Sequence, residues 1–198
     1  MADAGQSEAS IELLKTEATP AGFPQRLEQA IEIVDDAVAE VRNCLSGISQ
    51  AESERRPSPE AWSVGEIVHH LALVIARAGN LSTLVGTQAP DRFDYSAILA
   101  QRQFKLPEIA DAGKGGKGVA PEGTRPTHGG NIQDLLDELS RAWQESKRKL
   151  RTVSDQDLSR YYYEHYRLGP LNLYETIAFH GYHARKHLGQ IQRTLAAI

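Results

Sequence analysis

Hydrophobic residues in this chain recur mainly at intervals of three and four, the spacing that places them on one face of an α-helix. Four long segments show this pattern, and runs of strict hydrophobic–polar alternation, typical of β-strands, do not stand out. The first helix is expected to begin at Pro24, a favourable first-turn residue, and to end at Gly47 or in the polar stretch 50–54. Its apolar stripe is formed by Leu27, Ile31, Val34, Val38, Val41 and Leu45.

The second helix has a clear start signal. Ser63 and Glu66 have the spacing of a capping box, in which each side chain bonds the backbone N–H of the other residue. We therefore interpret Glu66 as a cap and not as a catalytic base. The residues that share the following apolar face are Ile67, His70, Leu71 and Val74, with Ala78 and Leu81 extending it.

The third and fourth helices also begin with capping residues. Asn131, with Asp134 three positions later, starts the third helix, and Ser154 ends it or caps a short turn. Asn172 and Glu175 form a cap pair for the fourth helix, which is expected to continue to about Ala196. The apolar positions of the third helix are Ile132, Leu135, Leu136, Leu139, Trp143, Leu150 and Val153.

These segments predict an all-α four-helix bundle. Residues 1–22 are small, polar and acidic and are expected to form a flexible tail, and residues 23–198 to form a single domain. The link over residues 87–130 is long for a compact domain, which is typical of a functional loop, and residues 94–105 are a candidate short helix within it. A long crossover of this kind lets the second and third helices run parallel.

Composition narrows the classes of partner and compartment. The chain has 198 residues, a formal net charge of −4 and no basic block, so we expect no nucleic-acid partner. No stretch approaches the roughly 18 apolar residues of a membrane span, and no signal peptide is expected. A single cysteine, Cys44, excludes an internal disulfide and a cysteine-rich zinc site, and it fits a reducing cytoplasm.

Three histidines are candidate metal ligands. His183 and His187 are four residues apart, so a helix stacks their imidazoles one turn apart on one face. His70 lies in the apolar stripe of the second helix and is also expected to face inward. Three neutral imidazoles would leave a coordination position open, as in catalytic sites, and the ligand type fits zinc or nickel.

The other histidines have simpler interpretations. An isolated H-x-x-x-H is short and common, and no glutamate follows His183, so the H-E-x-x-H of zinc proteases is absent. His180 can reach the same pocket, but we interpret it as packed or hydrogen-bonded behind the ligands. His69 points about 100° from the apolar stripe and is expected to face solvent. His128 and His165 lie in or near loops and carry little signal.

Two segments resemble the DinB-like, YfiT-type family. The residues from Trp62 to Leu71 resemble its W-S-x-x-E-x-x-x-H-L motif. The residues from Gly169 to Ile191 resemble its G-P-L-N-x-x-E…H-x-x-x-H-x-x-Q-I segment. The two matches occur in the expected order, with a long crossover between them, and the likeness extends over the bundle from about residue 24 to about residue 196.

The resemblance implies an up-down-down-up topology, often in a homodimer, and a divalent ion held by three histidines. These map onto His70, His183 and His187, because the first motif histidine falls eight after Trp62 and so selects His70 over His69. Some relatives transfer low-molecular-weight thiols such as bacillithiol or mycothiol to electrophiles, and others resemble maleylpyruvate isomerases that use such thiols.

Three functions therefore stand as hypotheses. The first is a metal-dependent thiol-S-transferase or hydrolase acting on a small molecule, with Arg92, Arg102, Lys105 or Arg125 of the crossover as candidate contacts to an anionic substrate. Arg185, between the two ligand histidines, is expected to point away from the metal face. The second is a stress-associated, non-catalytic bundle fastened by the ion. The third is a metal-free bundle with inward histidines bonded to one another or to carboxylates.

Overall fold

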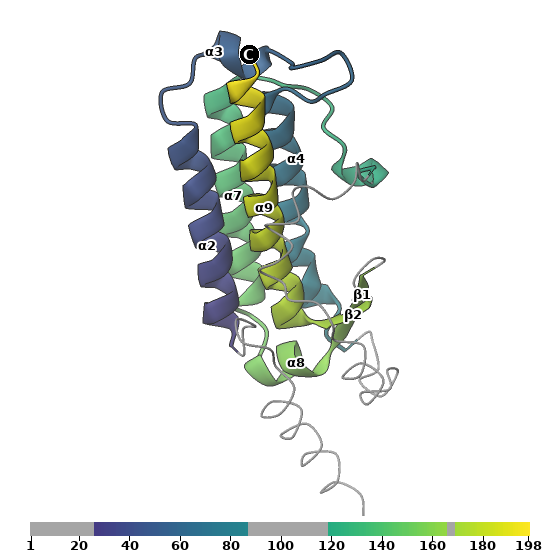
Figure 1. The fold of residues 1–198 in the computed structure, drawn as a ribbon. Helices are drawn as coiled ribbons and strands as arrows, with labels where there is room; N and C mark the ends of the chain where they lie inside the picture. Colours follow the sequence, from purple (N-terminus) through teal and green to yellow (C-terminus); the bar gives the residue numbers. More distant parts are fainter. Residues whose placement is uncertain (1–25, 87–118, 166–168) are drawn as a thin grey trace, which may run out of the picture.

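A computed structural model of the protein describes residues 26–86, 119–165 and 169–198. The predicted tail, the expected helix start at Pro24 and the candidate helix over 94–105 lie outside these residues. Four helices form the body of the molecule: α2 (Leu27–Cys44), α4 (Val64–Ala76), α7 (Ile132–Leu150) and α9 (Leu173–Ala196). They lie side by side along one long axis (Figure 1), which confirms the predicted helical bundle.

The four helices pack mainly as two neighbouring pairs. α2 packs along α9, α4 packs along α7, and α9 also contacts α4. The short helix α3 (Gln50–Glu54) and the chain's C-terminus lie at one end of the bundle in Figure 1. The helix α8 (Asp155–Arg160) and a small sheet lie at the opposite end. The contact between α4 and α9 matters most for function, because both carry candidate ligands.

The predicted caps start their helices as expected. Ser63 and Glu66 form both bonds of a capping box at α4, and Asn172 and Glu175 do the same at α9. At α7 the Asn131 Oδ1 accepts from two backbone N–H groups, those of Gln133 and Asp134. These bonds satisfy amide groups that have no partner within the helix, so they fix where each helix begins.

Several short elements were not predicted. α3 and two 3-10 helices, η1 (Ala78–Thr83) and η4 (Glu122–Thr124), are too short to show a helical hydrophobic period. Strands β1 (Tyr162–His165) and β2 (Gly169–Asn172) form an antiparallel pair in which Tyr162 lies opposite Asn172. Four-residue strands offer too few positions for alternation to be recognised, so the expectation of little strand structure missed this pair.

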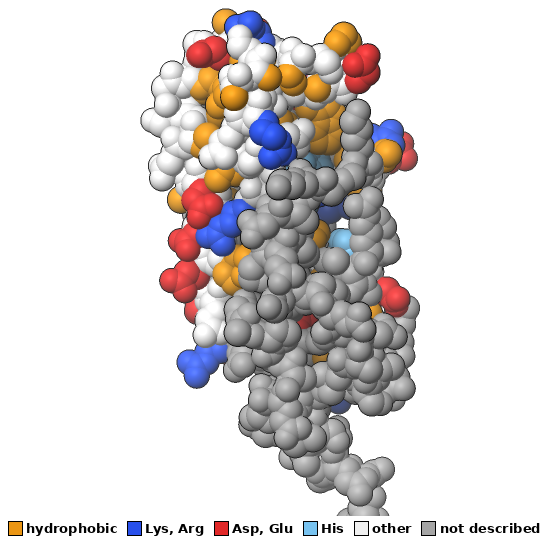
Figure 2. Space-filling view, viewed as in Figure 1, with side chains coloured by type: hydrophobic (Ala, Val, Ile, Leu, Met, Phe, Trp, Pro, Cys, Tyr) orange, Lys and Arg blue, Asp and Glu red, His pale blue; other side chains and the backbone are white. Residues whose placement is uncertain are grey.

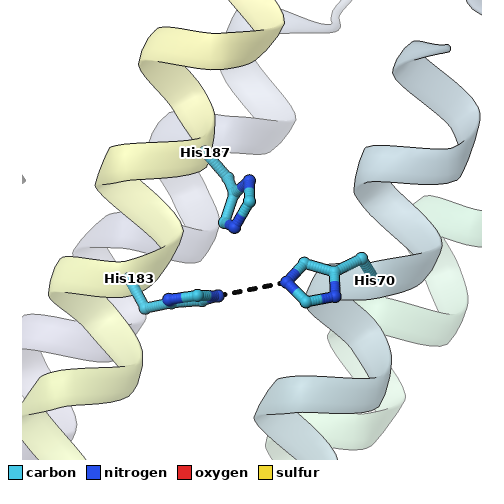
Figure 3. A group of neighbouring side chains, drawn as sticks. All are labelled: His70, His183 and His187. Carbon is cyan, nitrogen blue, oxygen red and sulfur yellow. Dashed lines mark hydrogen bonds between the residues drawn. The ribbon is translucent and has the colours of Figure 1, made fainter. Parts of the chain in front are cut away.

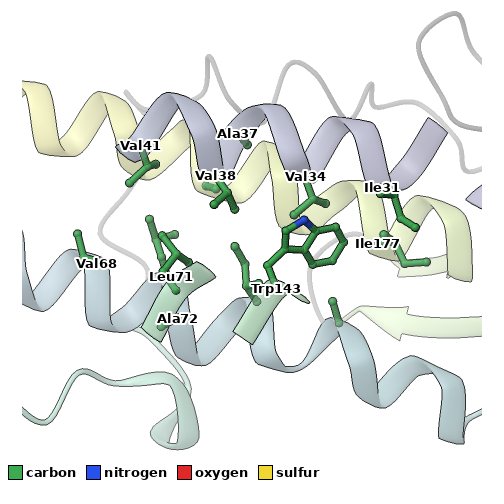
Figure 4. Close-up of a cluster of buried hydrophobic side chains, with 14 of the residues drawn as sticks. Ile31, Val34, Ala37, Val38, Val41, Val68, Leu71, Ala72, Trp143 and Ile177 are labelled. Atoms are coloured by element: carbon green, nitrogen blue, oxygen red, sulfur yellow. The ribbon is translucent and has the colours of Figure 1, made fainter. Parts of the chain in front are cut away.

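The core lies along the axis between the four helices (Figure 4). Trp143 of α7 is only 1% exposed, and its indole N–H donates to Asp35 Oδ1 of α2 at 2.7 Å. Lys147 pairs with the same carboxylate oxygen at 2.6 Å, so the polar end of the tryptophan is satisfied at the edge of the core. Other buried members are Ile31, Val34, Ala37, Val38, Val41, Val68, Leu71, Ala72 and Ile177.

One glycine sets the distance between α2 and α9. A Cβ on Gly181 would lie 2.7 Å from the Ile33 carbonyl oxygen, closer than real Cβ contacts allow. The two helix backbones can therefore approach at this point only because position 181 has no side chain. This close packing positions the middle of α9, two residues before His183.

Charged side chains of both signs are intermixed on the described part of the face shown in Figure 2. Pale blue histidine atoms are also visible there, among hydrophobic side chains. None of the helices within the described residues has the length and hydropathy required to cross a bilayer.

Candidate metal centre

Three histidines converge where α4 faces α9. His70 comes from α4, and His183 and His187 come from successive turns of α9. One ring nitrogen from each lies within 4.8 Å of the corresponding nitrogens of the other two. In Figure 3 the Nε2 atoms of His70 and His183 point at each other, 3.1 Å apart, and a nitrogen of His187 points into the space beside them. The helical spacing thus produces the inward pair that the sequence predicts.

Hydrogen bonds to Nδ1 of His70 and of His187 determine which nitrogen of each ring carries no proton. His70 Nδ1 lies 2.6 Å from the Thr124 carbonyl oxygen, which can only accept, so this nitrogen carries the proton. His187 Nδ1 lies 2.8 Å from Gln190 Oε1, and donation to this amide oxygen protonates Nδ1 there as well. Both rings consequently direct a bare Nε2 lone pair toward the centre of the group. This arrangement is typical of metal-binding histidines.

Burial keeps the three imidazoles neutral. His70 is 3% and His187 is 9% exposed. Desolvation lowers the pKa of His70, and desolvation together with the neighbouring His70 lowers the pKa of His187 to about 3. The pKa of His183 is held well below its usual value by burial, then by His187 and His70. Neutral imidazoles are the form that binds a metal ion, so protons compete weakly for this site.

Aromatic rings flank the candidate ligands on both helices. The Trp62 ring, which precedes the α4 cap, lies 5.1 Å from the His70 ring. The Phe179 ring lies 5.6 Å from that of His183. Aromatic rings packed beside a metal-binding histidine can restrict its rotation and limit the access of water. The tryptophan of the W-S motif therefore has a physical role beside the first histidine.

The donor set fits a divalent ion. A tetrahedral zinc ion with Zn–N bonds of about 2.0–2.1 Å requires ligand nitrogens about 3.3 Å apart. The His70–His183 separation of 3.1 Å is close to this value, and all three ligand atoms lie within 4.8 Å. Among the described residues, this is the group of histidine, cysteine and acidic side chains with a spacing that could hold an ion. Three protein ligands leave a further position for a water or substrate.

His180 lies one turn before His183 but outside the ligand group. Its Nδ1 lies 2.7 Å from the Thr176 carbonyl oxygen, and it is 7% exposed. Burial lowers its pKa to about 4. Its observed position thus agrees with the expected packed, hydrogen-bonded residue.

The prediction for His69 was wrong. His69 is 5% exposed and does not face solvent. Its ring stacks on that of His128 with centroids 4.1 Å apart, and its Nδ1 accepts from the Thr127 N–H at 3.3 Å. Thr127 and His128 cover this side of α4, and periodicity along a single helix cannot reveal such a covering segment.

The remaining predicted residues lie away from the ligands or outside the described residues. Arg185 bonds Glu40 of α2 and so points away from the histidines, as expected. Arg125 is exposed, and its Nε donates to the Ala120 carbonyl within its own segment. His165 contacts Phe179, with ring centroids 4.7 Å apart. Arg92, Arg102 and Lys105 lie outside the described residues.

Sequence reasoning missed the outer partners of the ligands. The partner of His70 is the backbone oxygen of Thr124, which a residue of any type could supply. This contact between residues 54 apart in sequence depends on the fold of the chain and cannot be predicted from residue type. The contact of Gln190 with His187 could have been predicted, because Gln190 lies three residues after His187 on the same helix face. The proximity of Gly129 to α4 was also missed: a Cβ on Gly65 would collide with the Gly129 carbonyl oxygen. This close approach brings residues 124–129 against the two histidines of α4.

Comparison with known proteins agrees with this geometry. A family model described as the DinB superfamily matches residues 33–191, which include all three histidines. This chain belongs to the DinB superfamily. Among solved structures, this DinB-superfamily chain is similar to YfiT from Bacillus subtilis, described as a probable metal-dependent hydrolase with an unusual four-helix bundle topology. The match has 17% identity and a TM-score of 0.55, and covers 90% of this chain and 91% of YfiT. No curated protein matches the chain.

Proposed function

We propose that this protein is a metal-dependent enzyme that acts on a small molecule, as a hydrolase or as a thiol-S-transferase. The observation that carries the proposal is the convergence of His70, His183 and His187 from two helices, with ring nitrogens within 4.8 Å of one another. Membership of the DinB superfamily and the description of YfiT as a probable metal-dependent hydrolase also support a metal-dependent enzyme.

The ligands, the ion and the co-substrate are part of this proposal. We assign all three histidines as ligands of one divalent ion, zinc or nickel. A bound ion of this kind would lower the pKa of a water or thiol in its remaining position, which makes a nucleophile near neutral pH. Thr124 and Gln190 would hold the His70 and His187 rings, and Trp62 and Phe179 would limit water at the site.

The proposal also covers the order of the helices, the oligomeric state and the cellular location. We propose the up-down-down-up order with a crossover between α4 and α7, a homodimer and a cytoplasmic location. The placement of α3 and the C-terminus at one end of the bundle, and of α8 and the strands at the other, supports this order (Figure 1). The single Cys44 supports a reducing compartment.

A second candidate function follows from where the ligands lie. Because they join α4 to α9, a bound ion could serve only to fasten the two helices in a non-catalytic, stress-associated bundle. The two candidates differ in the coordination position that remains: an enzyme must exchange its ligand there, whereas a fastening ion needs no exchange.

The decisive experiment measures metal content and then turnover. We expect about one divalent ion per chain by plasma mass spectrometry in the wild type and in His128→Ala, a matched control with an exposed imidazole. His70→Ala and His183→Ala should lose the ion. The loaded protein is then assayed with ester and amide substrates, and with bacillithiol or mycothiol plus an electrophile.

The outcomes separate the candidates. Turnover that disappears in His183→Ala supports the enzyme, and its dependence on thiol distinguishes transfer from hydrolysis. A retained ion that stabilises the fold without turnover supports the fastening role. Wild-type protein that binds no zinc, nickel or manganese after reconstitution contradicts both and leaves the metal-free bundle.

A further inference from the structure

A stretch of chain that is distant from α4 in sequence lies along the N-terminal half of this helix. Residues 124–130, called the 124–130 segment below, contact α4 at successive points. The Thr124 carbonyl oxygen accepts from His70 Nδ1 at 2.6 Å. Three residues later the Thr127 N–H donates to His69 Nδ1 at 3.3 Å. The segment thus reaches the candidate ligand and continues past its neighbour.

The next contact joins two backbones. Gly65, the second residue of α4, lies so close to Gly129 that a Cβ at position 65 would collide with the Gly129 carbonyl oxygen and lie 3.1 Å from the carbonyl carbon. Neither backbone atom can rotate away. An alanine at position 65 therefore fits only if α4 and the 124–130 segment move apart.

The far end of the 124–130 segment is held as well. Gln50 of α3 donates from Nε2 to the Gly130 carbonyl oxygen at 2.9 Å. Its Oε1 accepts from the N–H of Ile132, the first residue of α7, at 3.0 Å. Because the chain after Gly129 is fixed to α3 and α7, a displacement at Gly129 passes back toward Thr124.

We propose that Gly65 is a positioning residue for the candidate metal centre. It lets the 124–130 segment lie against α4, and the Thr124 carbonyl then holds the His70 ring with Nε2 directed toward His183. Moving the segment outward would lengthen the bond to Nδ1 and release the ring, so that metal binding would have to order it again. This inference rests on the proposed function, because the affinity for the ion is the property that Gly65 controls.

The test is the zinc affinity of Gly65→Ala in the full-length chain, measured by competition with a chromophoric chelator. The affinity should fall at least about tenfold, the lower end of the usual effect of losing an outer partner. Gly123→Ala is the matched control, because a Cβ there would lie 2.5 Å from an Arg77 guanidinium nitrogen, the end of a flexible side chain that can move aside. Its zinc affinity should equal that of the wild type.

A second measurement needs no metal. In the metal-free wild type the Nδ1 proton of His70 should exchange slowly with water, because the ring is 3% exposed and the proton is bonded to Thr124. In Gly65→Ala this exchange should be much faster. Nuclear magnetic resonance of protein with labelled histidines measures the exchange, and circular dichroism shows whether the fold is kept. A glycine needed only for stability would not change the exchange of this one proton in a folded variant.

A second variant covers the case in which Gly65→Ala does not fold. Gln50→Leu removes both hydrogen bonds at the far end of the 124–130 segment and places no atom against Gly129. It should lower the zinc affinity and speed the exchange of the His70 proton in the same direction. Gln133→Leu, at an exposed glutamine of α7, is its control and should leave both unchanged.

The outcomes distinguish this inference from the proposed function. Weaker zinc binding and faster proton exchange in folded Gly65→Ala, with both unchanged in Gly123→Ala, support the inference. A wild type that binds zinc and a folded Gly65→Ala of equal affinity overturn it and leave the proposed function intact. An equal loss in Gly123→Ala also overturns it, because the collision with Gly129 would then not be the cause. A wild type that binds no zinc overturns the proposed function, and this inference with it.

Discussion

The bond between His187 and Gln190 shows how one side chain orients a candidate metal ligand. The amide oxygen of Gln190 accepts the Nδ1 proton at 2.8 Å, which leaves Nε2 bare and fixes the ring. Its neutral charge adds nothing to offset a divalent ion. Gln190 therefore orients the His187 ring and leaves the charge of the candidate site unchanged.

Replacing Gln190 should change metal affinity in a graded way. Gln190→Leu removes the acceptor and should weaken zinc binding about 10- to 100-fold, the usual effect of losing an outer partner. Gln190→Glu keeps an acceptor of the same shape and should bind zinc at least as tightly as the wild type. Competition with a chromophoric chelator measures both affinities.

The exposed residue Gln192 on the same helix provides the control. Gln192→Leu should leave the zinc affinity unchanged. Equal affinities for wild type and Gln190→Leu would show that the hydrogen bond does not prepare the ligand.

At the scale of elements, the contact between α2 and α9 depends on a missing side chain. Gly181→Ala would place a Cβ 2.7 Å from the Ile33 carbonyl oxygen, a backbone atom that cannot rotate away. We expect the free energy of unfolding to fall by about 1–3 kcal/mol, the usual cost of overpacking a well-packed interface. Urea unfolding followed by circular dichroism measures the change.

A second glycine of α9 is the matched control. At Gly189 a Cβ would approach only the flexible Arg193 side chain, at 3.4 Å. Gly189→Ala should therefore raise the stability by about 0.5–1 kcal/mol through helix propensity. Equal effects at the two positions would contradict the close-approach argument.

For the whole molecule, buried histidines link stability to pH. In the folded state His180 and His187 have pKa values of about 4 and about 3, because burial disfavours their charged forms. In the unfolded chain both histidines have a pKa of about 6.5, so below that pH the unfolded chain binds more protons than the folded chain. The stability of metal-free protein should therefore be fully present above about pH 6.5 and fall steadily as the pH approaches 4.

Urea unfolding of the metal-free protein across this pH range tests the expectation. The double variant His180→Gln, His187→Gln should show a shallower decline, because two of the groups that take up protons on unfolding are gone. A wild-type stability that does not change between about pH 7 and about pH 5 would contradict the proposed linkage.

The sequence by itself predicted the helical architecture and the inward pair of histidines. The helix starts could be predicted because the side chains of Ser63, Asn131 and Asn172 accept hydrogen bonds from backbone N–H groups within three residues of themselves. The shared inward direction of His183 and His187 could be predicted for the same reason, because one helix fixes their relative positions. Local hydrogen bonds and helical spacing need no knowledge of the rest of the fold.

Only the tertiary structure decided how these local pieces meet. His69 proved buried because His128, which is distant in sequence, stacks against it. The carbonyl of Thr124 reaches His70, and Gly123 borders Arg77, because η4 lies along α4. Backbone acceptors and covering segments have no signature in residue type or period, so contacts between distant parts of the chain cannot be read from local pattern.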